Sequence, residues 1–151
     1  MIESIRGDIF KLWDQKEVQG IAHGVNSKGA MGAGVAREVR RRWPGLYLQY
    51  LELCHGPDAF PDCFPWNDPV ADMWVYNLHT QIHPGPNATL DLIRKAVSAM
   101  DQHARQHNLN SIAMPWIGSG IGGLDWADVL MLLDQELAAS PATYYLVEWQ
   151  K

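Results

Sequence analysis

The chain has 151 residues, of which 47% are hydrophobic, and its formal net charge is −5. This length suits one domain with a sizeable core, and we expect a single domain over residues 1–151. The acidic balance argues against broad binding to nucleic acid or to anionic membranes, because both favour a basic surface.

The N-terminus, MIESIRGDIF, has no apolar signal core, and no stretch approaches the about 20 apolar residues that a membrane span needs. The two cysteines, Cys54 and Cys63, form neither a CxxC pair nor a metal-like cluster with histidine. Free thiols in a reducing compartment are therefore expected. We predict a cytoplasmic monomer without a bound metal or cofactor.

The first half of the chain alternates short apolar strands with helices. Its predicted elements are an edge strand over residues 2–5, a strand over 19–25, a helix over 35–43 and a helix over 46–53. Pro44 and Gly45 separate the two helices. The arginines of the first helix mostly lie opposite its apolar residues, which favours a solvated face over a ligand site. Residues 55–69 contain four prolines and are predicted to be a loop, with a short strand around residues 62–64 as an alternative.

The second half continues the alternation. Its predicted elements are a strand over residues 72–78, a loop over 79–87, a helix over 89–107, a strand over 111–114, a glycine-rich loop over 118–124, a helix over 125–139 and a strand over 143–149. The inner stripes of the two helices are Leu90, Ile93, Val97 and Met100 in the first, and Leu130, Leu133 and Leu137 in the second. Alternating strands and helices predict an α/β fold of three layers, with a mixed central sheet covered on both faces.

The segment MPWIGSGIGGLDW at residues 114–126 joins a strand to a helix through four glycines. Glycines let a backbone approach an anion closely, and their N–H groups can point at a phosphate beside a helix N-terminus. In α/β sheets, ligands bind at the carboxyl ends of the strands. Two glycine-rich loops, at residues 26–34 and 118–124, therefore suggest a ligand with more than one phosphate. Neither common nucleotide signature is present.

Two aspartates have alternative interpretations. Asp8 either caps a short helical turn or accepts a hydrogen bond from a ligand amine, and the sequence slightly favours the cap. Asp125 is either an acid displaced from the second glycine-rich loop or the N-cap of the last helix, and we favour the cap.

Three segments together resemble the macrodomain family: GDIF at residues 7–10, HGVNSKGAMGAGVA at 23–36, and MPWIGSGIGGLDW at 114–126. Their order and spacing match, and the resemblance covers almost the whole chain. It implies binding of ADP-ribose, either free or attached to protein. The MGAG form of the first loop looks like the branch that contains the terminal ADP-ribose glycohydrolase and the antitoxins that reverse DNA ADP-ribosylation.

The resemblance implies ligand contacts at matching positions. Asp8 would accept a hydrogen bond from the adenine amino group, the Ile9 backbone would hold the ring, and Asn26 would border the distal ribose. The second glycine-rich loop would wrap the diphosphate through backbone N–H groups. The implied contacts with ADP-ribose are Asp8, Ile9, Asn26, Gly32, Ala33, Gly34, Val35, Gly118, Ser119, Gly120, Ile121, Gly122 and Gly123.

The resemblance implies a lysine and an aspartate that take part in catalysis in the glycohydrolases of this branch. Two positions of this chain differ from that pattern. Gln81 stands where the resemblance places the lysine, and Gly122 where it places the aspartate. An amide nitrogen is not nucleophilic, so a lysyl mechanism is excluded if this alignment holds.

The candidate catalytic residues are Asn26, Gln81 and His23. His23 precedes the first glycine-rich loop, as does a histidine in a phosphatase of this branch, and an imidazole suits general acid or base catalysis. A lone histidine in a strand is more often structural. His79 and His83 could reach the distal ribose or be merely exposed. A water activated by a substrate phosphate and held by these polar groups would need no strong protein base.

The leading hypothesis is an ADP-ribose-binding hydrolase of ADP-ribosyl esters on glutamate or aspartate of mono-ADP-ribosylated proteins. The alternatives are a non-catalytic ADP-ribose reader and an ADP-ribose 1″-phosphate phosphatase. The expected partner is ADP-ribose or an ADP-ribosylated protein, without membrane association. The negative net charge disfavours binding to nucleic acid, although a local basic patch around residues 37–42 could reverse that preference.

Overall fold

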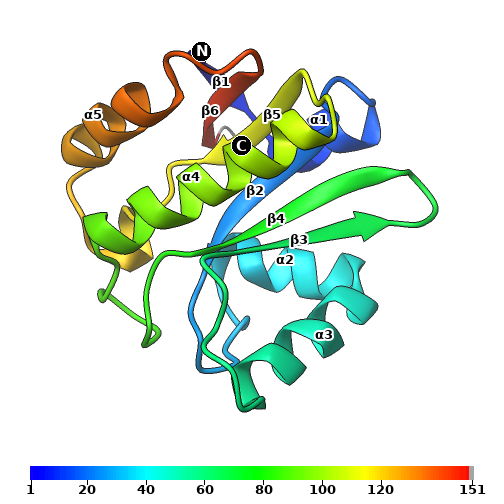
Figure 1. The fold of residues 1–151 in the computed structure, drawn as a ribbon, viewed down its shortest axis with the longest axis vertical. Helices are drawn as coiled ribbons and strands as arrows, with labels where there is room; N and C mark the ends of the chain where they lie inside the picture. Colours follow the sequence, from blue (N-terminus) through cyan, green and yellow to red (C-terminus); the bar gives the residue numbers. More distant parts are fainter. Residues whose placement is uncertain (150–151) are drawn as a thin grey trace.

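The computed structural model describes residues 1–149, which form three layers (Figure 1). The strands are β1 (Ile2–Gly7), β2 (Gly20–Val25), β3 (Cys63–Asp68), β4 (Met73–His79), β5 (Ser111–Pro115) and β6 (Thr143–Trp149). The helices are α1 (Ile9–Asp14), α2 (Gly34–Arg42), α3 (Pro44–His55), α4 (Leu90–Gln106) and α5 (Trp126–Leu137), with a 3-10 turn, η1 (Gly120–Gly122). The predicted α/β class is confirmed.

The six strands form one sheet in the order β1-β6-β5-β2-β4-β3. Every pair is parallel except β3 with β4, which is antiparallel, so the predicted mixed sheet is confirmed. The predicted edge position of β1 is confirmed as well. Because five neighbouring strands run in one direction, their carboxyl ends meet at one edge of the sheet, where loops can share a ligand.

Helices cover both faces of the sheet. Figure 1 shows α4 and α5 on one side and α1, α2 and α3 on the other. Each side has its own hydrophobic core, and alternate residues of β2 serve the two cores, because successive side chains of a strand point to opposite faces. Ala22 packs on the α4 and α5 side, whereas Ile21 and Val25 pack on the other.

The prediction that residues 55–69 are a loop is wrong over the second half of this range. Cys63–Asp68 forms β3, which is longer than the short strand considered around residues 62–64. The prolines were misleading because β3 pairs only with β4 and is an edge strand. Pro65 lacks an N–H group, and an edge strand tolerates that loss on its unpaired side.

The helix predicted over residues 46–53 is also longer, since α3 begins at Pro44. Proline is well placed in the first turn of a helix, where its missing N–H group has no intrahelical partner. The last helix begins after Asp125, whose carboxylate accepts a hydrogen bond from the Ala127 backbone N–H at 3.0 Å. The interpretation of Asp125 as an N-cap is therefore confirmed.

The inner stripes of the two long helices lie close to their predicted positions. Ile93, Val97 and Met100 of α4 are fully buried. In α5 the stripe is rotated, because Val129 is fully buried whereas Leu130 is only partly so. The buried residues of α5 are Val129, Leu132, Leu133 and Leu137.

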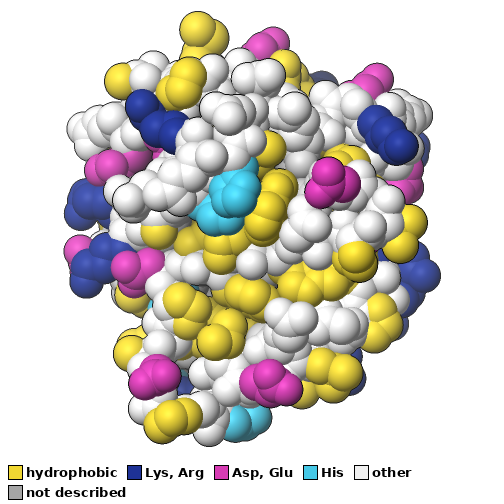
Figure 2. Space-filling model, turned by 45° about the vertical axis from the view of Figure 1, so that its right-hand side comes forward, with side chains coloured by type: hydrophobic (Ala, Val, Ile, Leu, Met, Phe, Trp, Pro, Cys, Tyr) yellow, Lys and Arg dark blue, Asp and Glu magenta, His cyan; other side chains and the backbone are white. Residues whose placement is uncertain are grey.

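Other expectations concern the thiols and the surface. Both cysteines are free, as predicted. None of the helices within residues 1–149 is long and apolar enough to cross a bilayer. On the face shown in Figure 2, hydrophobic side chains form a band across the middle, while lysines and arginines lie near its outline.

Candidate functional site

A crevice runs along the carboxyl edge of the parallel strands. It consists of two cavities of about 500 and 470 Å³, which share Gly34, Val35 and Pro115 in their walls. The first cavity lies at the ends of β1 and β6, and the second at the ends of β2, β4 and β5. Residues from both glycine-rich loops and from the loop over residues 79–87 line the second cavity, so the fold brings these three loops together.

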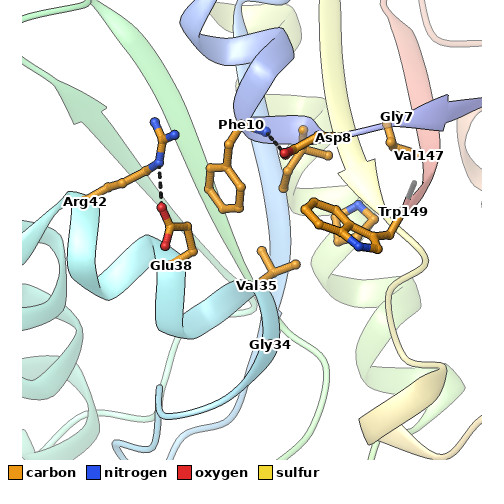
Figure 3. Close-up of a pocket in the computed structure, with 11 residues that line it drawn as sticks. Gly7, Asp8, Phe10, Gly34, Val35, Glu38, Arg42, Val147 and Trp149 are labelled. Atoms are coloured by element: carbon orange, nitrogen blue, oxygen red, sulfur yellow. Dashed lines mark hydrogen bonds and ion pairs between the residues drawn. The ribbon is translucent and has the colours of Figure 1, made fainter. Parts of the chain in front are cut away.

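The first cavity has a largely apolar wall. Figure 3 shows Phe10, Val35 and Trp149 directed toward one another around it. Asp8 also lines this cavity, and its Oδ1 accepts a hydrogen bond from the Phe10 backbone N–H at 2.8 Å. Asp8 is therefore the N-cap of α1, as the sequence favoured, and it borders the cavity as well.

A fixed ion pair forms the opposite wall of the first cavity. Arg42 donates to the Glu38 carboxylate at 3.1 Å and to both Asp14 oxygens at 2.9 and 3.0 Å, and its guanidinium lies over the Phe10 ring. Hydrogen bonds from Arg41 and Arg42 lower the pKa of Glu38 to about 2. The charges in this wall are therefore already paired, and the cavity suits an uncharged, flat group.

The second glycine-rich loop presents unpaired backbone donors to the second cavity. Gly118 and Gly120 have φ angles of +75° and +63°, which favour glycine. The loop closes on itself through hydrogen bonds from the N–H groups of residues 122–124. The N–H groups of residues 118–121 donate to no residue in the described part of the chain. This arrangement matches the backbone nests that bind anions.

The N-terminus of α2 supplies a second set of donors to the same crevice. Its N-cap, Ala33, has no side-chain hydrogen bond, and the N–H groups of residues 34–36 donate to no residue within 1–149. Helix N-termini carry a partial positive charge that favours anions. No lysine or arginine is among the described residues that line this cavity, so an anion there would be held mainly by backbone groups.

Ile121 reaches across the crevice. A Cβ atom placed on Gly34 would lie 3.5 Å from the Ile121 Cδ1, so this side chain extends from the second glycine-rich loop to the start of α2. Ile121 is nevertheless 58% exposed. It therefore covers the junction of the two cavities without filling it.

Asn26 organises the first glycine-rich loop. Its Oδ1 accepts hydrogen bonds from the backbone N–H groups of Lys28 and Ala30 at 3.0 and 3.3 Å, and from the Tyr50 hydroxyl at 3.1 Å. Its Nδ2 donates to the Ala30 carbonyl at 2.8 Å. Asn26 lines the second cavity, but its side chain is largely engaged within its own loop. Its geometry is that of a positioning residue.

Gln81 lies at the end of the second cavity away from Trp149 and is 9% exposed. Its Nε2 donates to the backbone carbonyls of His83 and Gly85 at 2.7 and 2.9 Å, which fixes the orientation of the amide. No hydrogen bond from a described residue reaches Oε1. Gln81 therefore offers the cavity a fixed acceptor and no nucleophile.

A side chain at Gly122 would be crowded by its neighbours. A Cβ atom there would lie 3.0 Å from the Ala88 Cβ and 3.5 Å from the Gln81 Oε1. The Ala88 backbone N–H also donates to the Gly122 carbonyl at 3.1 Å, which ties the loop after β4 to the second glycine-rich loop. A side chain at this position would therefore need Ala88 to shift by a few tenths of an ångström.

His23 is 1% exposed, and this burial lowers its pKa to about 4. Its Nε2 lies 2.7 Å from the Asn77 Oδ1, which can only accept, so Nε2 carries the proton. The Nδ1 atom is buried without a partner in residues 1–149. A neutral, enclosed imidazole is a poor proton carrier near neutral pH, and the geometry therefore argues against the predicted acid or base role.

Of these three histidines, His23 lines the second cavity, whereas His79 and His83 do not. His79 ends β4, and its Nε2 lies 3.0 Å from the Ser27 Oγ. Desolvation by burial lowers its pKa. His83 is exposed and contributes a backbone carbonyl to the Gln81 contact. Neither side chain lines the cavity.

The residues of the first cavity that sequence reasoning missed include Phe10, Arg42 and Trp149. Trp149 is 62% exposed at the end of β6, opposite Gly7 in the register of β1. Its position at a strand end beside GDIF could have revealed it. The pairing of Arg42 with Asp14 could not be found, because Asp14 lies 28 residues away in sequence.

The fold and this crevice define an α/β domain with two joined cavities and unpaired backbone N–H groups at the ends of its strands. The sequence model of the Macro domain family matches residues 22–133, and the chain therefore belongs to the Macro domain family. The resemblance expressed by the three segments is confirmed.

Several relatives resemble this chain over most of its length. It is 26% identical over 142 residues to a DNA ADP-ribosyl glycohydrolase of Thermus aquaticus, covering 92% of this chain and only 38% of that protein. It is 27% identical over 147 residues to an ADP-ribose 1″-phosphate phosphatase of Candida albicans, covering 89% of this chain and 93% of that protein. The macrodomain structure of Mycobacterium tuberculosis DarG matches with a TM-score of 0.84 and 26% identity, covering 100% of this chain and 98% of that chain.

Proposed function

We propose that this protein binds ADP-ribose along the crevice and hydrolyses an ADP-ribosyl bond at its far end. The adenine occupies the first cavity, against Phe10 and Trp149. The diphosphate lies against the unpaired backbone N–H groups, and the distal ribose lies beside Gln81. The observation that carries this proposal is the pair of donor sets, at residues 118–121 and 34–36, on one crevice whose second cavity has no lysine or arginine among its described lining residues.

The shape of the crevice supports an elongated ligand. Two joined cavities of about 500 and 470 Å³ fit the range of small-molecule sites, and Phe10 and Trp149 give the first an aromatic wall for a base. The names of the Thermus aquaticus and Candida albicans relatives both contain ADP-ribose. Free N–H groups at a helix start and at a glycine loop suit the two negative phosphates between the base and the distal sugar.

The residues at the far end limit the chemistry. Gln81 offers an acceptor that can orient a water molecule, while the region of Gly122 provides no acid. Water would add to the anomeric carbon, the bond to the carrier oxygen would break with its electron pair, and the released proton would pass to solvent. Without a strong base, this step needs an acidic leaving group and good orientation. The glutamate ester expected from the sequence is one member of that class.

A panel of substrates tests the proposal. Calorimetry would measure ADP-ribose binding, and release of ADP-ribose would be followed from glutamate-linked, serine-linked, thymidine-linked and 1″-phosphate forms. We expect turnover of one or more acidic-leaving-group substrates and about a tenfold or greater loss on changing Gln81→Ala. Gln102→Ala, an exposed glutamine on α4, is the control and should retain wild-type turnover. Absence of ADP-ribose binding would refute the proposal.

A second candidate, a reader that binds ADP-ribose without chemistry, has its own support. The Gln81 amide is engaged with two carbonyls, Ala88 fills the space beside Gly122, and His23 is enclosed. Calorimetric binding with no turnover of any panel member at high enzyme concentration would establish the reader. A phosphatase is the third candidate, and phosphate release from the 1″-phosphate form would identify it.

A further inference from the structure

Two histidines lie together at the C-terminus of α4. His103 belongs to the last turn of this helix, and His107 is its C-cap, so the two residues are about one turn apart. Side chains four residues apart on a helix are neighbours on one face. The two rings are stacked, with centroids 4.1 Å apart and an interplanar angle of 25°. Imidazole nitrogens from one helix face are therefore close together.

This pair belongs to the amino edge of the sheet, away from the crevice. His107 borders a third cavity, of about 480 Å³, whose other walls come from the starts of β2, β4 and β5 and the segments just before them. The crevice lies at the opposite ends of these strands. Among the described residues, none that lines the third cavity also lines the crevice. The pair is therefore separate from the proposed ADP-ribose site.

The ring of His103 is held in one orientation by β4. Its Nδ1 lies 2.8 Å from the hydroxyl oxygen of Tyr76, which is fully buried. The Trp74 ring packs against both imidazoles, with centroids 4.5 Å from His103 and 4.8 Å from His107. No hydrogen bond from residues 1–149 reaches the His103 Nε2. This nitrogen is therefore available to a ligand, and its direction is fixed in advance.

The contact between His103 and Tyr76 is of the kind that metal-binding histidines make. Such a histidine usually donates its second ring N–H to an oxygen, which fixes the tautomer and leaves the first nitrogen unprotonated. The Tyr76 oxygen can accept from the Nδ1–H, and Nε2 then carries a lone pair. Desolvation by burial and the neighbouring His107 lower the pKa of His103, so its ring is uncharged near neutral pH. Metal ions bind imidazole in this neutral form.

The charges around the pair also suit a cation. The C-terminus of a helix carries a partial negative charge, and both histidines lie at the C-terminus of α4. Arg105 lies between them in sequence, but its guanidinium is paired with the Asp101 carboxylate at 2.9 Å. Lys16 and Asp72, in the wall of the third cavity, have opposite charges. The local charges therefore do not oppose the approach of a metal ion.

We propose that His103 and His107 chelate a divalent transition-metal ion of the kind that prefers imidazole, such as Ni²⁺, Cu²⁺ or Zn²⁺. His103 binds through Nε2, and the exposed His107 ring turns to share the ion. Within residues 1–149, no group of three or more histidine, cysteine, aspartate or glutamate residues could hold a metal. Water therefore completes the coordination, and the ion exchanges readily. This inference is independent of the proposed function.

Calorimetric titration of the full chain with Ni²⁺ tests the site. We expect one ion per chain. His103→Gln and His107→Gln should each weaken binding at least tenfold, since even the loss of an outer contact costs about 10–100-fold. The matched control is His55→Gln, which removes a single exposed histidine from the last turn of α3. This control should change the Ni²⁺ affinity less than twofold.

Tyr76→Phe distinguishes a metal site from a pair of histidines that only pack together. This change keeps the buried ring and removes the hydroxyl that orients His103, so Ni²⁺ affinity should fall about tenfold. Thermal unfolding checks that the variant is folded. Bound Ni²⁺ should also quench the fluorescence of Trp74, which lies against both imidazoles. Trp74→Phe should remove most of this quenching while calorimetry still detects binding.

Three results would overturn the inference. The first is that the wild-type chain does not bind Ni²⁺. The second is that His55→Gln loses as much affinity as His103→Gln and His107→Gln, which would show that binding is spread over the surface. The third is that ADP-ribose displaces the ion, because the metal would then lie in the crevice and not at the amino edge of the sheet.

Discussion

Asn26 and Gln81 were both predicted as catalytic, yet each uses its polar atoms to hold a loop. Asn26 ties three groups to one oxygen, and Gln81 bridges two carbonyls. Side chains engaged in this way place the backbone around a ligand before the ligand arrives. Asn26 and Gln81 therefore preorganise the loops that line the crevice. Of their polar side-chain atoms, the Gln81 Oε1 would be available to a reacting water.

Asn26→Ala tests this role. Removal of its side chain leaves the Tyr50 hydroxyl and two backbone N–H groups without their acceptor, and the expected cost is about 1–3 kcal/mol of stability. We expect weaker ADP-ribose binding in calorimetry together with a lower midpoint in urea. Unchanged stability with loss of turnover alone would instead make Asn26 a catalytic residue.

His23 gives a pH prediction. Its pKa is about 4 in the folded protein and about 6.5 when unfolded, so the unfolded chain binds more protons between these values. The stability contributed by the neutral histidine is complete above about pH 6.5 and is lost as the pH falls toward 4. The full loss is about 3 kcal/mol.

Urea unfolding at several pH values compares His23→Gln with the wild type. Glutamine does not titrate and can still donate to Asn77, so the fall in stability between pH 6.5 and 4 should shrink. His79 and His103 also have pKa values lowered by desolvation, and their contribution should remain in both proteins. Identical pH profiles would show that His23 is not buried as the structure has it.

At the scale of elements, the second glycine-rich loop depends on space and on backbone conformation. A Cβ atom on Gly118 would lie 2.5 Å from the Cδ1 of Ile93, which is fully buried in the core. Gly120 has a similar positive φ angle, but a Cβ atom there would meet nothing within 4 Å. Alanine substitutions at the two glycines therefore distinguish the cost of steric crowding from the cost of backbone strain.

Gly118→Ala should destabilise the protein more than Gly120→Ala. Both variants bear left-handed strain of about 1–2 kcal/mol, and only the first adds crowding of about 1–3 kcal/mol. Thermal unfolding and ADP-ribose calorimetry on the two variants check this. Equal losses of stability would mean that Ile93 moves aside and that crowding is unimportant.

The sequence predicted most elements, because periodic apolar residues and capping side chains act locally. The carboxyl-edge loops followed from alternating strands and helices, and the glycines marked the donor loop. The strand Cys63–Asp68 was largely missed because prolines obscured it, although it pairs with the next strand, β4, across a short turn. The burial of His23 against Asn77 was invisible because 54 residues separate the partners.

At the scale of the whole molecule, the crevice joins segments from both ends of the chain. Residues of β1, α2, the second glycine-rich loop and β6 all line it. A ligand that spans both cavities therefore contacts elements that would separate on unfolding. Its binding free energy should appear as added stability of the entire domain.

ADP-ribose at 100 times its Kd should stabilise the fold by about 2.7 kcal/mol. For a domain of this size, that corresponds to a rise in Tm of about 5–10 °C, measurable by differential scanning fluorimetry. AMP, which would fill only the first cavity and part of the second, should give a smaller shift at equal concentration. Equal shifts for both ligands would show that the second cavity contributes no binding.

The contact between Ile121 and the start of α2 has a kinetic consequence. A ligand that occupies both cavities would lie close to this side chain, so we expect its entry and escape to be slowed unless Ile121 moves aside. Association should then be slower than diffusion allows, and bound ligand should have a long residence time. Ile121 would therefore slow the dissociation of the product.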